Sequence, residues 1–153
     1  RQNVAMASGV GRTPEERYEH AMEYVKLVGL EDYADLSPVE LSTGMKQRLG
    51  LARVLASQAE VLLMDEPFAS LDFLTRAELQ HQVLQLQQKL PRTILLVTHQ
   101  LDEALLLGQS ITVMHPLGKT ETFDLSHLSY PRDLENGELK DLRRAVTEAC
   151  RKD

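Results

Sequence analysis

Residues 61–72, with the sequence VLLMDEPFASLD, decide the fold. An apolar run leads to two adjacent acids, Asp65 and Glu66, and then breaks at Pro67. A short apolar run of this kind predicts a strand that is buried on both faces, as the strands of a parallel sheet are. Neighbouring carboxylates repel each other, so this pair at the end of a buried strand indicates a place where a cation and a phosphate bind.

Outside this stretch the sequence alternates between helical and strand patterns. Apolar residues at helical spacing, with caps and with glycine or proline stops, predict helices at residues 13–29, 41–57, 74–90, 101–108 and 134–151. Apolar runs of strand length occupy residues 61–65, 93–99 and 110–115. This alternation predicts an α/β fold with a parallel sheet and crossover helices.

The composition limits the class of protein. The chain has 153 residues, enough for one domain with a buried core. Its formal net charge of −6 argues against direct binding of nucleic acid, which needs clustered Lys and Arg. The single cysteine, Cys150, excludes an internal disulfide framework and suits a reducing compartment. No apolar run approaches the ~20 residues of a membrane-spanning helix, and no signal-peptide pattern opens the chain.

The polar residues that follow the first two predicted strands are candidates for nucleotide chemistry. In nucleotide hydrolases with parallel sheets, an Asp at a strand end holds Mg²⁺, often through water, and an adjacent Glu can orient or deprotonate the attacking water. His99 follows the second predicted strand, where an imidazole can donate a hydrogen bond to a phosphate oxygen. Taken singly, each has a commoner explanation, namely two solvated acids and a histidine with an ordinary polar partner.

A second candidate segment is LSTGMKQR, residues 41–48, where a loop turns into a helix. Backbone amides and the positive end of the helix dipole point outward together at such a terminus and attract phosphate oxygens. Gly44 would allow a phosphate to approach closely, and Ser42 adds a hydroxyl donor. An ordinary capped helix is the commoner explanation of this pattern taken alone.

Together these segments resemble the ATP-binding subunit of an ABC transporter. LSTGMKQRLGLARVLA (residues 41–56) resembles the family signature and its helix, and VLLMDEPFASLD resembles the Walker B strand, the catalytic glutamate and the D-loop. LLVTHQLDEALLLG (residues 95–108) resembles the histidine switch and the helix after it. The tail SYPRDLENGELKDLRRAV (residues 129–146) is similar to importer ATPases of the nitrate, sulfonate and taurine type.

The resemblance implies a partial P-loop NTPase fold of the ABC ATPase kind, with a role for each matching residue. Asp65 would position Mg²⁺ through water. Glu66 would act on the hydrolytic water, and His99 would contact the γ-phosphate. These roles make ATP and Mg²⁺ the implied cofactors.

The resemblance also implies that two ATP sites form between two ATPase subunits that pair head to tail. Ser42 and Gly44 would contact the γ-phosphate of the ATP held by the other subunit, and Asp72 would lie in the D-loop that crosses to that subunit. The chain departs from the family pattern at three positions. Thr43 replaces a glycine of the signature, Met45 replaces the commoner Gln, and Gln100 stands where Asp is frequent.

The largest departure is that the phosphate-binding loop GxxxxGK[ST] does not occur in the sequence. SGVGRT (residues 8–13) lacks its lysine, its spacing and a preceding strand, so we interpret it as a loop before the first predicted helix. The family places the phosphate loop, the adenine-stacking aromatic residue and the Q-loop glutamine upstream of the residues seen here. We therefore expect the C-terminal part of a longer ATPase, and no ordinary ATPase activity from this chain alone.

These expectations define three segments. Residues 1–57 would hold part of the helical subdomain with the signature helix, residues 58–125 the C-terminal half of the ATPase core, and residues 126–153 a tail helix. The parent protein would be an importer ATPase on the cytoplasmic face of the cell membrane. It would drive a small anion or organic sulfonate through a permease, with a substrate-binding protein as an indirect partner.

Two other hypotheses are open to test. The chain could be a non-hydrolytic interaction module that pairs with a complete ATPase and lends it a signature helix. Glu66 and His99 argue against this hypothesis, because a module without chemistry has no need of them. An ABC ATPase of DNA repair or translation is a third hypothesis, which the short loop between the predicted helices and the importer-like tail disfavour.

Overall fold

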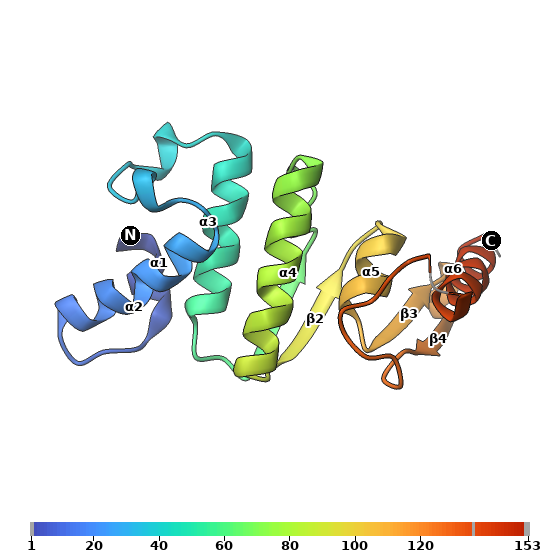
Figure 1. Ribbon diagram of the computed structural model, residues 1–153. Helices are drawn as coiled ribbons and strands as arrows, with labels where there is room; N and C mark the ends of the chain where they lie inside the picture. Colours follow the sequence, from blue (N-terminus) through green and yellow to red (C-terminus); the bar gives the residue numbers. More distant parts are fainter. Residues whose placement is uncertain (1, 136, 152–153) are drawn as a thin grey trace. The chain divides into compact units, whose positions relative to one another are not determined.

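The computed structural model describes residues 2–135 and 137–151. These residues form two compact units, and the boundary between them falls between Val97 and Thr98 in the sequence (Figure 1). The predicted segments 1–57 and 126–153 therefore include four positions outside the described residues, namely 1, 136, 152 and 153.

Three packed helices open the first unit. Helices α1 (Gln2–Ser8), α2 (Pro14–Leu27) and α3 (Thr43–Ala56) all contact one another (Figure 1). The predicted capping box of α2 is confirmed: the Thr13 hydroxyl accepts a hydrogen bond from the Glu16 amide, and the Glu16 carboxylate accepts one from the Thr13 amide. Two short 3-10 helices, η1 (Glu31–Tyr33) and η2 (Pro38–Glu40), connect α2 to α3.

The helix α1 was not predicted, because seven residues are too few to show a clear apolar period. The helix nevertheless packs into the core, since Val4 is fully buried and Ala5 is nearly so. Small side chains let the helices approach closely. The three helices contribute the following buried apolar residues: Val4, Ala5, Ala21, Tyr24, Val25, Leu51, Ala52, Leu55 and Ala56.

The predicted parallel pairing is confirmed for the first two strands. Strand β1 (Val61–Asp65) runs parallel to β2 (Thr93–Val97), in a register that places Val61 opposite Thr93 and Asp65 opposite Val97. Helix α4 (Phe73–Lys89) supplies the crossover between them (Figure 1). Because the two strands are parallel, their carboxyl ends, at Asp65 and Val97, lie at the same edge of the sheet.

The prediction that β1 is buried on both faces is wrong. Leu62 and Met64 are buried, whereas Val61 and Leu63, which point to the other face, are 54% and 67% exposed. The neighbouring strand repeats the pattern, with Leu95 58% and Val97 54% exposed. Side chains alternate between the two faces of a strand, so a helical layer on one face leaves the second face to solvent. In the part of the chain that the structure describes, that second face is apolar and uncovered.

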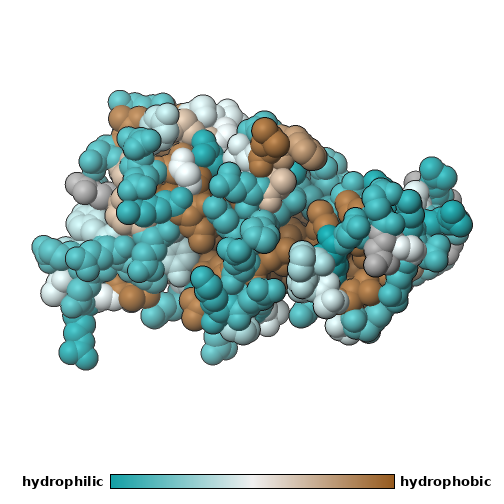
Figure 2. Space-filling model, viewed as in Figure 1, coloured by the Kyte–Doolittle hydropathy of each residue, from teal (hydrophilic) through white to brown (hydrophobic). Residues whose placement is uncertain are grey.

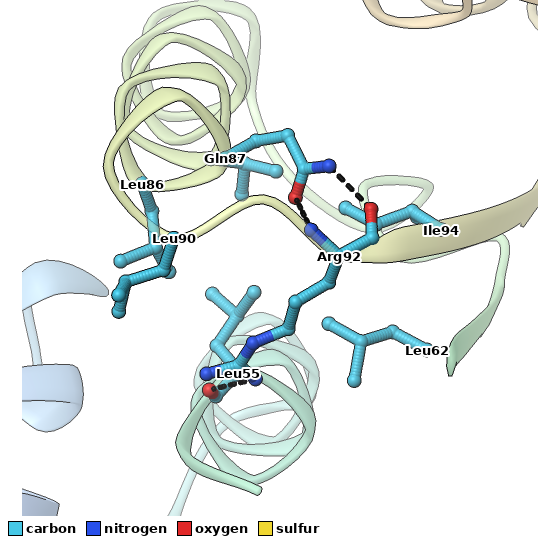
Figure 3. Close-up of a pocket in the computed structure, with 8 residues that line it drawn as sticks. Leu55, Leu62, Leu86, Gln87, Leu90, Arg92 and Ile94 are labelled. Carbon is cyan, nitrogen blue, oxygen red and sulfur yellow. Dashed lines mark hydrogen bonds between the residues drawn. The ribbon is translucent and has the colours of Figure 1, made fainter. Parts of the chain in front are cut away.

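Arg92 ties the start of β2 to two helices. Its guanidinium donates a hydrogen bond to the Leu55 carbonyl oxygen at 3.0 Å (Figure 3). It donates a second one to the Ser57 carbonyl oxygen at 2.6 Å, and so satisfies carbonyls at the C-terminal end of α3. Its backbone exchanges hydrogen bonds with the Gln87 side chain on α4. These contacts surround a small apolar pocket, lined in part by Leu55, Leu62, Leu90 and Ile94.

The second unit holds a hairpin between two helices. Helix α5 (Leu101–Leu107) precedes β3 (Ser110–Met114) and β4 (Thr120–Asp124), and α6 (Gly137–Ala149) follows. The third predicted strand is thus present as β3, but it pairs antiparallel with β4 rather than in a parallel sheet. The reason is the tight reversal between them, where Leu117 and Gly118 both have positive φ and the His115 amide donates to Lys119 at 2.8 Å.

The core of the second unit joins α5, β3 and α6 with Leu125, the residue directly after β4, and the partly buried Phe123 of β4 packs against it. Its buried apolar residues are Leu105, Ile111, Leu125, Leu139 and Val146. On the surface, the guanidinium of Arg143 in α6 lies 2.9 and 3.0 Å from the two carboxylate oxygens of Asp102 in α5. This ion pair supports the packing of α5 on α6, although exposed pairs of this kind contribute little free energy.

Arg132 holds the loop after β4 against the end of α5. Its guanidinium donates to four carbonyl oxygens, those of Leu105, Gly108, Leu125 and Leu128. It also lies over the Tyr130 ring, 4.3 Å from the centroid. Because this corner is partly shielded from water, burial lowers the pKa of Arg132 from its ordinary value and raises the pKa of Tyr130.

None of the helices in the described residues combines the length and the apolar character that a bilayer crossing requires.

We predict that replacing Arg132 by Met destabilises the second unit. The change leaves four partly buried carbonyl groups without their charged donor, at a cost of about 1–3 kcal/mol in the free energy of unfolding. Urea unfolding followed by circular dichroism measures this loss. Arg144→Met, at an exposed position of α6, is the matched control and should change stability little. Equal stability of the two variants would contradict the role of Arg132.

Candidate functional site

Asp65 is the last residue of β1, at the carboxyl end of the parallel pair. In open parallel sheets this edge is where ligands bind. Asp65 is exposed, because its side chain lies on the face of β1 opposite to that of the buried Leu62 and Met64. One carboxylate at such an edge fits Mg²⁺, which protein sites hold with few carboxylates while waters and substrate phosphates complete the octahedron.

Glu66 has an unusual backbone for a residue with a side chain. Its φ is +46°, in the left-handed region, where a non-glycine residue carries a strain of about 1–3 kcal/mol. The conformation is held from both sides: the Glu66 amide donates to the Val97 carbonyl at 2.9 Å, and the Glu66 carbonyl accepts from the Ala69 amide at 3.2 Å. The first of these bonds continues the ladder between β1 and β2 by one residue. A strained backbone at a predicted catalytic residue is a feature that functional sites share.

The turn after Glu66 is anchored in the core. Pro67 and Phe68 are buried, and Phe68 is only 1% exposed. The chain then returns to the surface and reaches Asp72, whose carboxylate caps α4 by accepting a hydrogen bond from the Thr75 amide at 3.1 Å. This bond, with a further one from the Thr75 side chain, lowers the pKa of Asp72 from its ordinary value.

Two large apolar residues beside Asp72 face solvent. Phe73 is 79% and Leu74 76% exposed. Figure 2 shows apolar side chains gathered at the N-terminal end of α4, above a largely hydrophilic surface. An exposed apolar pair next to a predicted partner-contacting residue fits a surface that a second protein covers.

Ser42 and Gly44 lie at the start of α3, as predicted. Ser42 is the N-cap, and its hydroxyl oxygen accepts a hydrogen bond from the Met45 amide at 3.3 Å. The hydroxyl hydrogen takes no part in that bond, so a capping serine keeps a donor for a ligand. Thr43, the departure from the family signature, is the first helical residue and is exposed. Its Cβ therefore causes no crowding within the chain.

Gly44 lies against the turn that follows β1. A Cβ added there would be 3.5 Å from the Ser70 carbonyl oxygen and 3.9 Å from the Leu71 side chain, which are ordinary contacts. The fold therefore tolerates a methyl group at this position. If Gly44 is required to be glycine, the requirement comes from a ligand or partner.

Gln47 joins α3 to the turn that follows β1, and it was not among the predicted site residues. The Gln47 side-chain amide donates to the Glu66 carbonyl at 2.5 Å, and its oxygen accepts from the Ser70 amide at 2.8 Å and from the Ser70 hydroxyl. Gln47 looks like any polar helical residue in the sequence, and only its partly buried position distinguishes it.

His99 belongs to the second unit, in the exposed loop between β2 and α5. Its neighbours are well ordered by hydrogen bonds: the Thr98 hydroxyl donates to the buried Glu103 carboxylate at 2.8 Å and accepts from the Gln100 amide at 3.0 Å. The first unit brings together the signature helix, Asp65, Glu66 and the turn to Asp72. The position of His99 relative to these residues stays a prediction.

A second site is not marked by a metal cluster in residues 2–135 and 137–151. No group of three or more His, Cys, Asp or Glu side chains is arranged to hold a metal ion there. The small pocket of Figure 3 lies toward the amino ends of β1 and β2, away from Asp65. Its polar residues, Arg92 and Gln87, are hydrogen-bonded to each other.

Comparisons with known proteins find similarity to ABC transporter ATP-binding proteins. A family model described as ABC transporter matches residues 1–69. The taurine import ATP-binding protein TauB of Rhizobium johnstonii is 44% identical over 117 residues, which cover 74% of this chain and 44% of that protein. The glycine betaine/carnitine transport ATP-binding protein GbuA of Listeria monocytogenes is 51% identical over 104 residues, which cover 68% of this chain and 26% of that protein.

A solved structure shares the fold. The dimeric structure of MJ0796, a bacterial ABC transporter cassette, matches with a TM-score of 0.70 and 28% identity, covering 80% of this chain and 53% of the other. The same cassette has also been solved as a dimer in a post-hydrolysis state with ADP and Pi. The predicted partial ABC ATPase fold is confirmed by this match. The chain spans about half the length, or less, of the relatives and the cassette it matches.

We predict a pH-dependent contribution to stability from Asp72. Because the pKa of Asp72 is lower in the folded chain, the charged carboxylate stabilises the fold at neutral pH. That stability is lost as the pH falls below about 4 and through the folded-state value. Asn at this position also caps a helix but does not titrate, so the difference in melting temperature between wild type and Asp72→Asn should shrink between pH 6 and pH 3. A constant difference across this range would contradict the linkage.

Proposed function

We propose, from its place among the ABC transporter ATP-binding proteins, that this chain supplies the signature helix and the hydrolytic end of an importer ATPase. The observation that carries the proposal is the left-handed Glu66 beside Asp65, at the carboxyl end of a parallel strand pair. In this arrangement Asp65 would hold Mg²⁺ through water, and Glu66 would orient the hydrolytic water or take its proton. Bound Mg²⁺ would offset negative charge on the phosphates.

His99 would complete the group by donating a hydrogen bond to the γ-phosphate. Its exposed position after β2 supports this role, since parallel strands end at the same edge of the sheet. The hydrogen bonds of Thr98 with Glu103 and Gln100 would steady the loop that carries it.

The second part of the proposal concerns a head-to-tail pair of ATPase subunits. Ser42 and Gly44 would contact the γ-phosphate of an ATP bound by the partner subunit, because the start of α3 presents backbone amides and a free hydroxyl hydrogen outward. Asp72 would lie at the subunit contact. The exposed Phe73 and Leu74 beside it support such a contact, and the relative MJ0796 forms a dimer.

The third part concerns the transported solute. We infer a small anion or organic sulfonate, supported by the similarity to the taurine import protein and by the tail at residues 129–146. The ATPase would act at the cytoplasmic face of the membrane, against a permease, with a substrate-binding protein as an indirect partner. Residues 1–57, 58–125 and 126–153 would serve as helical subdomain, ATPase core and tail.

A second candidate function is an interaction module that lends α3 to a complete ATPase without hydrolysing ATP. The exposed start of α3 and the exposed residues after Asp72 are what favour it. Mixing this chain with a complete ATPase of the taurine-import type and measuring mixed-dimer formation tests the module. Failure of the two to associate would count against it.

We predict ATP hydrolysis when this chain is joined behind the N-terminal portion of the Rhizobium johnstonii taurine import protein that precedes the matched region. In this fusion, Glu66→Gln should keep ATP binding and lower the turnover by about 100-fold or more, because an amide cannot accept the proton of water. Glu78→Gln, on the exposed face of α4, is the control. Turnover equal to wild type in the Glu66→Gln variant would remove Glu66 from this role.

We also predict that Gly44→Ala separates stability from activity. The fold accepts the added methyl group, so the melting temperature should not fall, whereas close approach of a partner's phosphate is obstructed and the turnover of the fusion should drop. Gly50→Ala on the same helix meets no atom within 4 Å and is the control. A Gly44→Ala fusion as active as wild type would contradict the contact in trans.

A further inference from the structure

The turn from Glu66 to Ser70 is held by one side chain from another helix. The Gln47 amide group bridges its two ends, donating to the Glu66 carbonyl at 2.5 Å and accepting from the Ser70 amide at 2.8 Å and from the Ser70 hydroxyl. Gln47 is separated from these residues by 19 and 23 positions in the sequence. Both ends of the side-chain amide are therefore committed to the same turn.

This bridge acts where the backbone is strained. Glu66 has a φ of +46°, which its own side chain disfavours. In this backbone conformation the Glu66 carbonyl accepts hydrogen bonds from both the Ala69 amide and the Gln47 side chain. Strained conformations persist where surrounding contacts over-determine them. Two contacts on Glu66 come from outside the turn, namely the Val97 carbonyl of β2 and the Gln47 side chain of α3.

The bridge also links two segments with different proposed partners. Helix α3 begins at Thr43, with Ser42 as its cap, and Gly44 packs against the Ser70 carbonyl. A shift of α3 therefore reaches the Glu66–Ser70 turn at two places, through Gln47 and through the packing at Gly44. Beyond Ser70 the chain continues directly to Asp72 and α4.

We infer that Gln47 is a positioning residue for Glu66, and that it couples the start of α3 to the backbone that carries this carboxylate. The inference rests on the proposed function, in which Ser42 and Gly44 serve the partner's ATP while Glu66 serves the other site. When α3 docks on the partner's nucleotide, the Gln47 side-chain amide would then shift the backbone position of Glu66. Neither Asn nor Glu replaces Gln47: Asn is one methylene shorter, and Glu cannot donate to the Glu66 carbonyl when ionised.

The bridge is tested first on the 153-residue chain, without nucleotide. In Gln47→Met, which keeps the side-chain length but loses both hydrogen-bonding ends, the Ser70 amide should exchange its hydrogen about tenfold faster. The Ala69 amide donates to a backbone carbonyl and should change less, which makes it an internal reference. Gln88→Met, at an exposed position of α4, is the matched control. Unchanged exchange at Ser70 in Gln47→Met would overturn the bridge.

The positioning role is tested in the ATPase fusion described above. Gln47→Met and Gln47→Glu should each lower kcat by about 10- to 100-fold, with the KM for ATP nearly unchanged, because a displaced carboxylate impairs the chemical step and not nucleotide binding. Gln47→Glu should at the same time keep slow exchange at Ser70, since a carboxylate still accepts that hydrogen bond. This combination separates loss of positioning from general loosening of the turn.

The two tests fail in different ways. A wild-type fusion without ATPase activity would overturn the proposed function, while the exchange at Ser70 would still decide the bridge. An active fusion in which both Gln47 variants keep the wild-type kcat would overturn the positioning role and leave the proposed function intact.

Discussion

The hydrogen-bonded pairing of β1 with β2 is the constraint on which the candidate site depends. Its parallel register sets Asp65 opposite Val97, and one further bond, from the Glu66 amide to the Val97 carbonyl, extends the ladder into the turn. That last bond helps hold Glu66 in its left-handed conformation, from which the chain bends into the buried Pro67 and Phe68. Without the pairing, neither acid would stand at an edge where parallel strands present ligand-binding residues.

Several residues of the site combine a structural role with the proposed one. Ser42 caps α3 and Asp72 caps α4, so each would stabilise the chain even if no nucleotide ever bound. The two roles are compatible because each uses a different atom or direction. A serine oxygen that accepts from the helix leaves its hydrogen for a ligand, and a helix N-terminus is favourable for negative charge in either role. Simple activity loss on mutation therefore does not distinguish them, whereas paired measurements of stability and turnover do.

Most of the fold followed from periodicity and end signals, and the failures have physical causes. The capping box at Thr13 and the cap at Ser42 are local patterns, and the parallel pairing of β1 with β2 follows from the alternation of strand and helix patterns. The structure confirms all three. The burial of β1 on both faces was wrong because burial depends on a second layer, which strand composition alone does not supply. The partner of β3 was missed because its reversal uses Leu117 at positive φ, a conformation that leucine does not signal. Gln47 was missed because its two contacts lie far away in sequence, and the roles of Asp65, Glu66 and His99 remain predictions.

The apolar outer face of the β1–β2 pair has a practical consequence for the polypeptide in a cell or a test tube. This apolar patch consists of Val61, Leu63, Leu95 and Val97. It lies beside the outer backbone edges of a sheet that has two strands in the described residues. Chaperones and proteases recognise surfaces of this kind, and so do other copies of the same patch. Polar substitutions in this apolar patch should therefore raise the soluble yield and slow the aggregation of the purified protein. Substitutions on the charged faces of the helices should change both less.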